Sequence, residues 1–182
     1  MKVAYIISMK NGIPPFIYSE LEYLEQNGIS FRIFPTKCNK GMCDPKDEWE
    51  IYRFSIIKIA LKQFLYLLTK PVLWVKLFFE AIFTNSLVEF LIATDIASEM
   101  KDIDRIHCHF GDTKFIIGYY CKKIINKPLS VTIHAHSLYR NKWKIFKRAL
   151  DYCDKIVSIS EYNKSILMNK FGINADKIIV NH

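Results

Sequence analysis

Short apolar runs alternate along the chain with longer segments in which apolar residues recur every three or four positions. A short, mainly apolar run predicts a buried strand, whereas the longer spacing predicts a helix. Pro15 suits the first turn of a helix and Gly28 suits a helix end, so these two residues bound the first helical segment. We expect six strands, at residues 3–8, 29–34, 105–110, 129–134, 155–159 and 177–180.

This alternation predicts an α/β fold built on one doubly wound parallel sheet of the Rossmann-like kind. Asp112 and Ser160 stand where two later helices should begin, because their side chains can accept hydrogen bonds from free N–H groups of the first turn. Residues 143–152 should form another helix between two strands. The chain has 182 residues, of which 51% are hydrophobic, so we expect a single domain spanning residues 1–182.

A helical insertion at about residues 54–100 interrupts the alternation. It should contain two or three helices, separated near Lys70 and again near Asn85. Its most apolar stretch, residues 72–93, carries Lys76, Glu80 and Glu89. Each charge at the centre of a spanning helix costs on the order of 3 kcal/mol, so this stretch should not cross a bilayer.

Two interpretations of the aromatic-rich helices at residues 54–93 stay open. They could cover one edge of the sheet. They could also form a peripheral membrane face, with aromatic side chains in the interface and Lys58, Lys62 and Lys70 near anionic headgroups.

The net charge of the chain limits the kinds of partner that it is expected to bind. Lys and Arg number 26 against 18 Asp and Glu, and the net charge of +8 favours a polyanion, an anionic membrane surface or a phosphate-bearing ligand. No nucleic-acid-binding module or arginine-rich stripe is recognisable, so we expect no nucleic-acid partner. The five cysteines form no Cys-x-x-Cys pair and no signal peptide is visible, which favours the cytoplasm.

Two histidine runs stand at the ends of successive predicted strands. The first is Ile-His-Cys-His-Phe-Gly at residues 106–111, and the second is Val-Thr-Ile-His-Ala-His at residues 131–136. Open α/β sheets bind ligands where their strands end, and histidine exchanges protons near neutral pH. These runs therefore predict a functional site.

One possible chemistry is that of a metal-dependent hydrolase. Residues i and i+2 of a strand face the same way, so His107 with His109, and His134 with His136, could each chelate an ion such as zinc. No carboxylate-rich motif accompanies the histidines, so we expect no metal.

The loop Asn-Gly-Ile-Pro-Pro at residues 11–15 suggests a phosphate site. Gly12 would let the backbone approach a ligand at a helix N-terminus, where amide groups and the helix dipole favour phosphate. A non-enzymatic phosphate- or nucleotide-binding domain is therefore a further alternative.

Taken together, these motifs resemble the N-terminal domain of glycosyltransferase family 4, of the GT-B architecture, especially its bacterial polysaccharide and colanic-acid-type enzymes. The resemblance covers essentially the whole chain. It rests on five segments in the same order, at residues 11–16, 106–111, 132–136, 157–163 and 177–182.

The resemblance implies a retaining hexosyltransferase whose active site lies between two Rossmann-like domains. The N-terminal domain holds the acceptor, a polysaccharide or a polyprenyl-diphosphate-linked glycan, and the C-terminal domain binds the nucleotide sugar. No cofactor or obligatory metal is expected. The family's donor-clamping residues belong to a C-terminal domain that this chain lacks, so the chain alone should be inactive.

Residue roles follow from the same resemblance. His134 matches the histidine that contacts the transferred sugar, and Gly12 matches the loop glycine that approaches the donor phosphates. Ser160 and Glu161 match a strand-end pair that faces the cleft, and His136 is a further candidate for substrate contact. His107 and His109 should pack beneath the site. The expected protein is a cytoplasmic enzyme of polysaccharide biosynthesis, peripheral at the inner face of the cell membrane.

Overall fold

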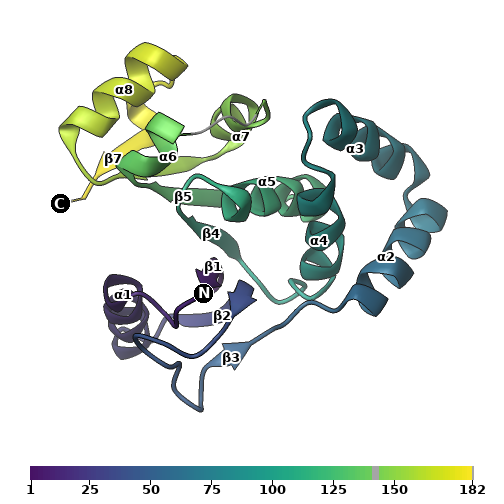
Figure 1. The fold of residues 1–182 in the computed structure, drawn as a ribbon, viewed down its shortest axis with the longest axis horizontal. Helices are drawn as coiled ribbons and strands as arrows, with labels where there is room; N and C mark the ends of the chain where they lie inside the picture. The colour runs from purple at the N-terminus through teal and green to yellow at the C-terminus, as the bar shows by residue number, and fades with distance from the viewer. Residues whose placement is uncertain (141–143, 182) are drawn as a thin grey trace.

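A seven-stranded, all-parallel sheet organises the computed structural model, which describes residues 1–140 and 144–181 (Figure 1). The strand order is β3-β2-β1-β4-β5-β6-β7. The Rossmann-like prediction is confirmed, but β3 was not predicted, because two residues are too few to leave an apolar run. The strands are β1 (Lys2–Met9), β2 (Ser30–Cys38), β3 (Glu50–Ile51), β4 (Arg105–His109), β5 (Leu129–Ile133), β6 (Lys155–Ser158) and β7 (Ile178–Val180).

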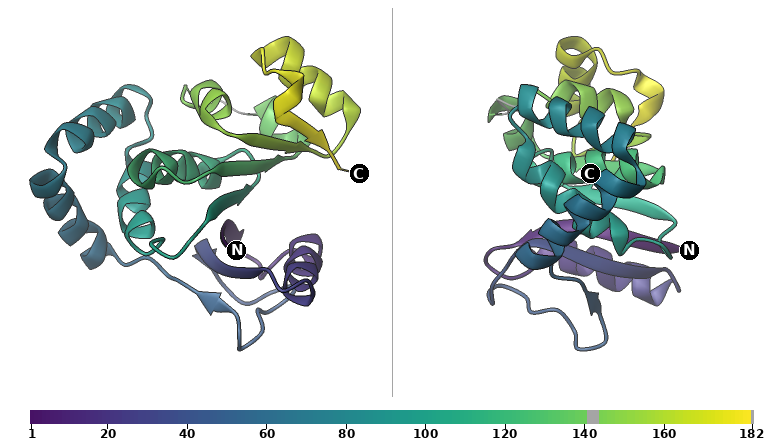
Figure 2. Two further views of the ribbon diagram at one scale, coloured as in Figure 1. Left: turned by 180° about the vertical axis from the view of Figure 1, so that it is seen from behind. Right: turned by 90° about the vertical axis from the view of Figure 1, so that its right-hand side faces the viewer.

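Helices connect these strands and lie on both faces of the sheet (Figures 1 and 2). The helix predicted at residues 143–152 corresponds to α7, although its first residue, Trp143, lies outside the described residues, as does His182. The helices are α1 (Pro15–Gln26), α2 (Ile56–Thr69), α3 (Pro71–Phe83), α4 (Leu87–Ser98), α5 (Thr113–Ile125), α6 (Ala135–Arg140), α7 (Phe146–Tyr152) and α8 (Glu161–Phe171).

The alternation of side chains along β1 divides the core in two. Ala4 and Ile6 belong to the large core beneath α5, whereas Tyr5 and Ile7 belong to a smaller core together with Ile17 of α1. Successive residues of a strand point to opposite faces, so these two cores lie on opposite sides of the sheet. Helix α1 therefore shares its face of the sheet with Tyr5.

The helical insertion forms a layer outside α5. Its helices break where predicted, because α3 begins at Pro71 and Asn85 adopts a positive φ of 55° between α3 and α4. Helix α4 packs on α5, with the rings of Phe90 and Tyr120 5.5 Å apart. Helices α2 and α3 pack on α4, so the insertion is stacked on a helix layer. Among the described residues, no helix has both the length and the apolar character that crossing a bilayer requires.

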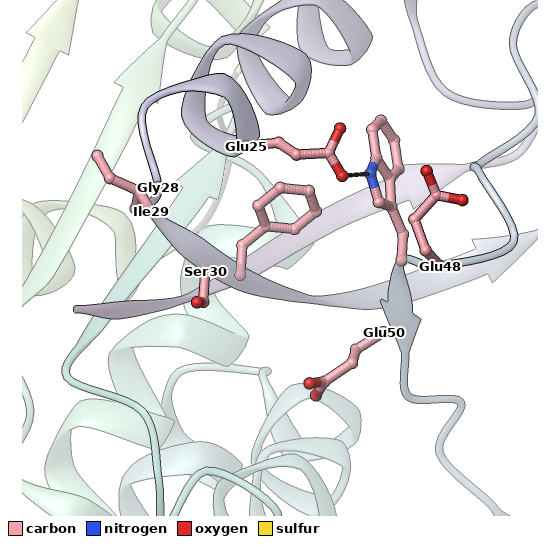
Figure 3. A pocket seen from close by; sticks show the side chains of 8 residues that line it. Glu25, Gly28, Ile29, Ser30, Glu48 and Glu50 are labelled. Atoms are coloured by element: carbon pink, nitrogen blue, oxygen red, sulfur yellow. Dashed lines mark hydrogen bonds between the residues drawn. The ribbon is translucent and has the colours of Figure 1, made fainter.

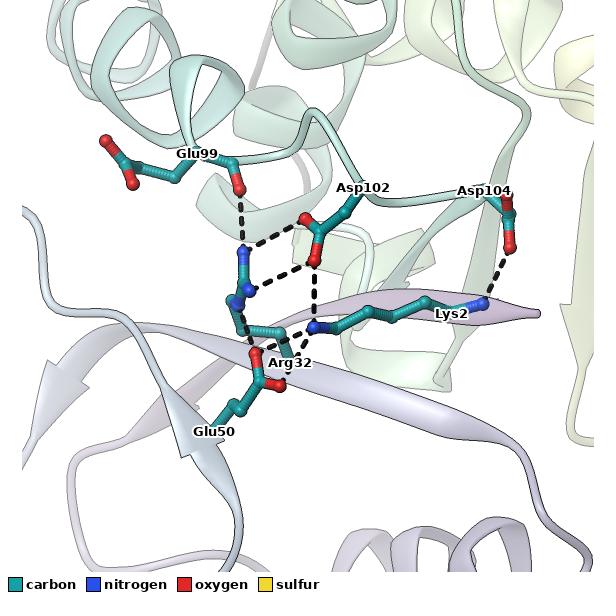
Figure 4. Close-up of polar contacts among 6 residues, drawn as sticks. All are labelled: Lys2, Arg32, Glu50, Glu99, Asp102 and Asp104. Atoms are coloured by element: carbon teal, nitrogen blue, oxygen red, sulfur yellow. Dashed lines mark hydrogen bonds and ion pairs between the residues drawn. The ribbon is translucent and has the colours of Figure 1, made fainter.

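A network of ion pairs closes the amino-terminal edge of the sheet (Figure 4). The Lys2 ammonium and the Arg32 guanidinium both contact the carboxylates of Glu50 and Asp102. These contacts tie β1 and β2 to the short β3 and to the loop before β4. They stabilise this edge and leave the opposite, carboxyl-terminal edge for a site.

Candidate functional site

The carboxyl ends of four neighbouring strands bring the sequence-predicted site residues to one edge of the sheet (Figure 1). Gly12 follows β1, Phe110 follows β4, His134 follows β5 and Ser160 follows β6. Because these strands are parallel and adjacent, their ends meet at the same edge, as the fold class predicts.

The loop after β1 needs glycine at position 12 for its own packing. Gly12 has a φ of +72°, and a Cβ there would come within 2.7–2.9 Å of backbone atoms of residues 41–43. Two backbone hydrogen bonds hold the segments together, from Ile13 N to Cys43 O and from Met42 N to Asn11 O, each 2.8 Å. A phosphate that approached this loop would therefore have to bind next to the segment at residues 41–43, because that segment packs directly against Gly12.

The start of α1 offers fewer amide donors than the sequence suggested. Pro14 and Pro15 have no N–H group, and the N–H groups of Ile17 and Tyr18 already donate to the carbonyl of Pro14 at 3.0 Å. The positive end of the helix dipole remains. This helix terminus alone is a weak phosphate site.

His134 lies between β5 and the short helix α6, and its ring is half-buried. The ring stacks on Phe110, with centroids 4.4 Å apart and planes at 30°, and Phe16 of α1 lies 5.5 Å away. Burial and the nearby His109 lower the pKa of His134, so its imidazole is neutral at neutral pH. Its Nε2 is buried and has no hydrogen-bond partner among the described residues.

That unpartnered nitrogen indicates a place for a ligand. Leaving a buried polar atom unsatisfied costs roughly 1–3 kcal/mol, which a hydroxyl bound to His134 would recover. The Phe16 side chain borders the same imidazole and is itself 49% exposed, so the ring lies near the surface of the chain.

Phe110 shows backbone strain beside His134. Its φ of 72° is in the left-handed region, which a bulky residue rarely adopts and which costs on the order of 1–3 kcal/mol. The Lys114 ammonium lies 5.1 Å from the centroid of the Phe110 ring. The backbone N–H of Phe110 donates a hydrogen bond of 2.9 Å to Thr132 O. Phe110 and Phe16 were not among the candidates drawn from the sequence, and only the backbone angle and the stacking reveal them.

The second member of the later histidine run lies apart from the first. β5 ends at Ile133, one residue before the predicted end of the strand, and residues 135–140 form α6. His136 therefore lies on a helix, with an exposed side chain. The prediction that His134 and His136 lie on one strand, as a chelating pair, is therefore wrong.

The first histidine pair lies below the site, buried as expected. The two ring nitrogens of His107 lie 2.8 Å from Ser130 Oγ and 3.2 Å from Thr132 Oγ1. His109 is 1% exposed, and its Nε2 lies 3.0 Å from Oε2 of Glu20, although this contact lacks the angle of a regular hydrogen bond.

Glu20 of α1 joins that buried layer. Tyr5 donates a hydrogen bond of 2.7 Å from its hydroxyl to Oε1 of Glu20. Burial alone would raise the pKa of Glu20, but its contacts with His109 and Tyr5 outweigh burial and lower the pKa to about 2. The ionised carboxylate thus holds α1 against β1 and β4.

Only one group of potential metal ligands occurs among residues 1–140 and 144–181. The ligand atoms of Glu20, His107 and His109 all lie within 4.8 Å of one another. Both ring nitrogens of His107 face hydroxyls, so a metal would have to displace Ser130 or Thr132. The four-histidine centre of the hydrolase alternative is not assembled, because neither His134 nor His136 joins this group.

We expect His107 to make the stability of the chain depend on pH. Burial lowers the pKa of His107 from 6.5 to about 3, so below pH 6.5 the unfolded chain binds a proton that the folded chain excludes. Stability should fall by at most about 1.4 kcal/mol per pH unit from pH 6.5 towards 3. Urea unfolding at pH 7, 5 and 4 measures this. In His107→Asn the slope should be smaller, and an unchanged slope would exclude His107 as its source.

Ser160 and Glu161 stand at the start of α8. The Ser160 hydroxyl accepts a hydrogen bond of 3.1 Å from Asn163 N and so caps the helix, as Asp112 caps α5. Glu161 is exposed, with Lys164 Nζ 3.7 Å away. Both residues lie at the same edge of the sheet as His134. The Ser160 hydroxyl is used by the helix cap, whereas the exposed Glu161 carboxylate has only the long contact with Lys164.

A pocket of about 280 Å³ lies at the other end of the sheet, beside the start of β2 (Figure 3). Glu25 lines it but is already bound, because it accepts a hydrogen bond of 2.9 Å from Trp49 Nε1 and one of 2.7 Å from Lys46 Nζ. This pocket belongs to the packing of α1 against the loop before β3. It does not extend to His134.

Comparison with known proteins assigns this fold to a family. The model of the family described as Glycosyltransferase Family 4 matches residues 10–182. No curated protein sequence matches the chain significantly.

Solved structures share the fold at low sequence identity. A glycosyltransferase from Rickettsia africae ESF-5 is 16% identical with a TM-score of 0.56, and the match covers 98% of this chain and 42% of that chain. MurG of Acinetobacter baumannii is 11% identical with a TM-score of 0.55, covering 99% and 44%. UDP-GlcNAc 2-epimerase from Neisseria meningitidis, bound to UDP-GlcNAc, is 17% identical with a TM-score of 0.55, covering 99% and 46%. The chain thus spans less than half the length of each.

Proposed function

The chain belongs to Glycosyltransferase Family 4, and from this premise we propose that it is the acceptor-side half of a retaining hexosyltransferase. The enzyme would transfer a sugar from a nucleotide sugar to a polysaccharide or a polyprenyl-diphosphate-linked glycan. A second domain, C-terminal to this chain, would bind most of the donor. The observation that carries this proposal is the neutral imidazole of His134 at the carboxyl edge of the sheet, whose Nε2 has no hydrogen-bond partner in the described part of the chain.

The chemistry of glycosyl transfer suits such a group. Positive charge builds on the sugar and negative charge on the leaving diphosphate as the glycosidic bond breaks. A neutral imidazole can hydrogen-bond a sugar hydroxyl without adding charge of its own, and fixed donors that are oriented in advance stabilise developing charge. His134 would therefore orient the transferred sugar, with the rings of Phe16 and Phe110 fixing the imidazole from two sides.

The remaining candidates would contact substrate around that centre. Gly12 shapes the loop beside the donor phosphates, and Ser160, Glu161 and His136 would line the acceptor path. Glu161 is the best placed of these to bind an acceptor hydroxyl, because its carboxylate is exposed. No metal or organic cofactor takes part in the proposed reaction.

The two alternative functions have less support. A hydrolase built on four histidines would need His134 and His136 beside His107 and His109, and they do not join that group. A non-enzymatic nucleotide-binding domain would need amide donors at the start of α1, where Pro14 and Pro15 have none. The proposed enzyme would work in the cytoplasm, at the inner face of the membrane, in polysaccharide biosynthesis. Acceptor-dependent transfer from a nucleotide sugar by the two-domain protein tests the proposal.

A further inference from the structure

Helix α2 has its apolar side turned to solvent. A surface helix normally buries its apolar stripe against the core. In α2 no residue is fully buried, and the side that faces α4 carries Gln63, which binds Thr94 Oγ1 and Trp74 Nε1. The opposite stripe is apolar and exposed at helical spacing: Ile57 (74%), Leu61 (65%), Phe64 (65%) and Leu68 (64%).

Helix α3 continues this arrangement. Its inner side packs on the core through Leu77 and Ala81, which are buried. The hydrogen bond of 2.9 Å from Trp74 Nε1 to Gln63 Oε1 joins the inner sides of the two helices, so their outer sides both face away from α4. The exposed apolar side chains of α3 are Val72, Val75, Phe79, Ile82 and Phe83. We name this set, with the stripe of α2, the α2–α3 face.

The charged residues of the segment that carries most of the α2–α3 face are all basic. Residues 51–79 contain no Asp or Glu. They contain five basic residues, Arg53, Lys58, Lys62, Lys70 and Lys76. The first acidic residue of α3, Glu80, points inward, where Lys123 Nζ lies 2.8 Å from its carboxylate.

We propose that the α2–α3 face docks on an anionic lipid surface. An exposed apolar surface of this extent marks an interaction site, and apolar side chains flanked by lysines are the pattern of interfacial helices. A second copy of the chain fits poorly, because pairing two such faces would bring only positive charges together. Headgroups of negative charge complement the lysines while the acyl region takes up the apolar side chains.

The position of the α2–α3 face in the fold indicates which kind of acceptor a docked chain could reach. Helices α2 and α3 lie at the opposite end of the long axis from α1 and the C-terminus, as Figure 1 and the left view of Figure 2 show. A docked chain would therefore hold the His134 edge away from the bilayer. Resting on the proposed transferase function, this orientation favours the distal end of a glycan over a sugar attached directly to a lipid diphosphate.

Vesicle co-sedimentation of this chain tests the docking. We expect it to bind vesicles of phosphatidylcholine with 30% phosphatidylglycerol, and to bind pure phosphatidylcholine at least tenfold more weakly. The double variant Phe64→Glu, Leu68→Glu should lose at least tenfold in binding. Lys58→Gln with Lys70→Gln should lose roughly 25-fold in binding to anionic vesicles, because each lysine near such a surface contributes about a fivefold gain.

Tyr23→Glu is the matched control, because Tyr23 of α1 is 65% exposed, as Phe64 is. Its binding should equal that of the parent chain. Equal binding by all variants, no binding to anionic vesicles, or a dimer in sedimentation that Phe64→Glu dissolves would each overturn the proposal. Circular dichroism of each variant confirms folding. The vesicles contain no acceptor or nucleotide sugar, so a negative result leaves the transferase proposal untouched.

Discussion

Replacing His134 with alanine in the proposed two-domain enzyme should lower kcat for sugar transfer by at least about 100-fold. The estimate follows from the loss of one preorganised hydrogen-bonding group at a reaction centre, which typically costs roughly 10²–10³ in rate. The imidazole stacks on the strained Phe110, and its buried Nε2 has no hydrogen-bond partner among residues 1–140 and 144–181, so this atom is left for a ligand. The measurement is the initial rate of acceptor-dependent release of nucleoside diphosphate at saturating substrates.

His136→Ala is the comparison for this experiment, because it removes the same ring two residues away, from an exposed position on α6. As a proposed acceptor contact, His136 should change the KM for the acceptor and leave kcat nearly as it is. Its effect on kcat should stay within about fivefold. The variants should differ little in unfolding free energy, since His134 is only half-buried. A His134→Ala enzyme with the parent's kcat would show that the site has been misplaced.

Gly12→Ala should destabilise the chain by roughly 2–5 kcal/mol and displace the loop before α1. A non-glycine residue at a φ of +72° costs about 1–2 kcal/mol in backbone strain. The new methyl group would also meet backbone atoms at 2.7–2.9 Å, and such overpacking adds roughly 1–3 kcal/mol. Backbone atoms cannot move aside as a flexible side chain can, so the segment at residues 41–43 should detach.

Gly28→Ala separates strain from crowding. Gly28 has nearly the same φ, +70°, but nothing lies within 4 Å of its Cβ position. Its alanine variant should therefore lose only the strain contribution, about 1–2 kcal/mol. Urea unfolding compares the two variants. Equal losses at the two positions would mean that the loop tolerates the methyl group and that its packing does not depend on glycine.

The strand pattern of the chain was predictable because buried parallel strands leave continuous apolar runs. The strand residues 3–7, Val-Ala-Tyr-Ile-Ile, illustrate this. At residues 105–109 the pattern alternates instead, because Ile106 and Cys108 fill the large core and the histidines lie between them in sequence. The two helix caps were also predictable, because Asp112 and Ser160 act through bonds to residues two and three positions away. Local signals of this kind survive folding unchanged.

Other features depend on contacts that a linear sequence does not reveal. The contact of Glu20 with His109 joins residues far apart in the chain, and only the packing of α1 on the sheet brings them together. Helix α6 begins immediately after His134, although the sequence pattern there is typical of a strand. The predicted pairing of His134 with His136 was wrong for this reason. The left-handed φ of Phe110 likewise follows from tertiary contacts.

The histidines that first suggested one site divide into two layers. His107 and His109 form the buried floor with Glu20 and Tyr5, whereas His134 stands above them at the edge. The floor holds α1 in place, and α1 carries Phe16 beside the His134 ring. The buried histidines are therefore expected to support the site without touching substrate.

The most direct test of the transferase proposal is an assay of the purified, proposed two-domain protein against a panel of labelled nucleotide sugars. The reaction contains a chelator, so that no free metal contributes. The proposal predicts that one nucleotide sugar donates its label to a glycan acceptor and that nucleoside diphosphate is released only when the acceptor is present. Residues 1–182 alone should release none. Absence of transfer from every donor would contradict it. Hydrolysis of the acceptor in a parallel reaction with added zinc, without chelator and without any donor, would also contradict it.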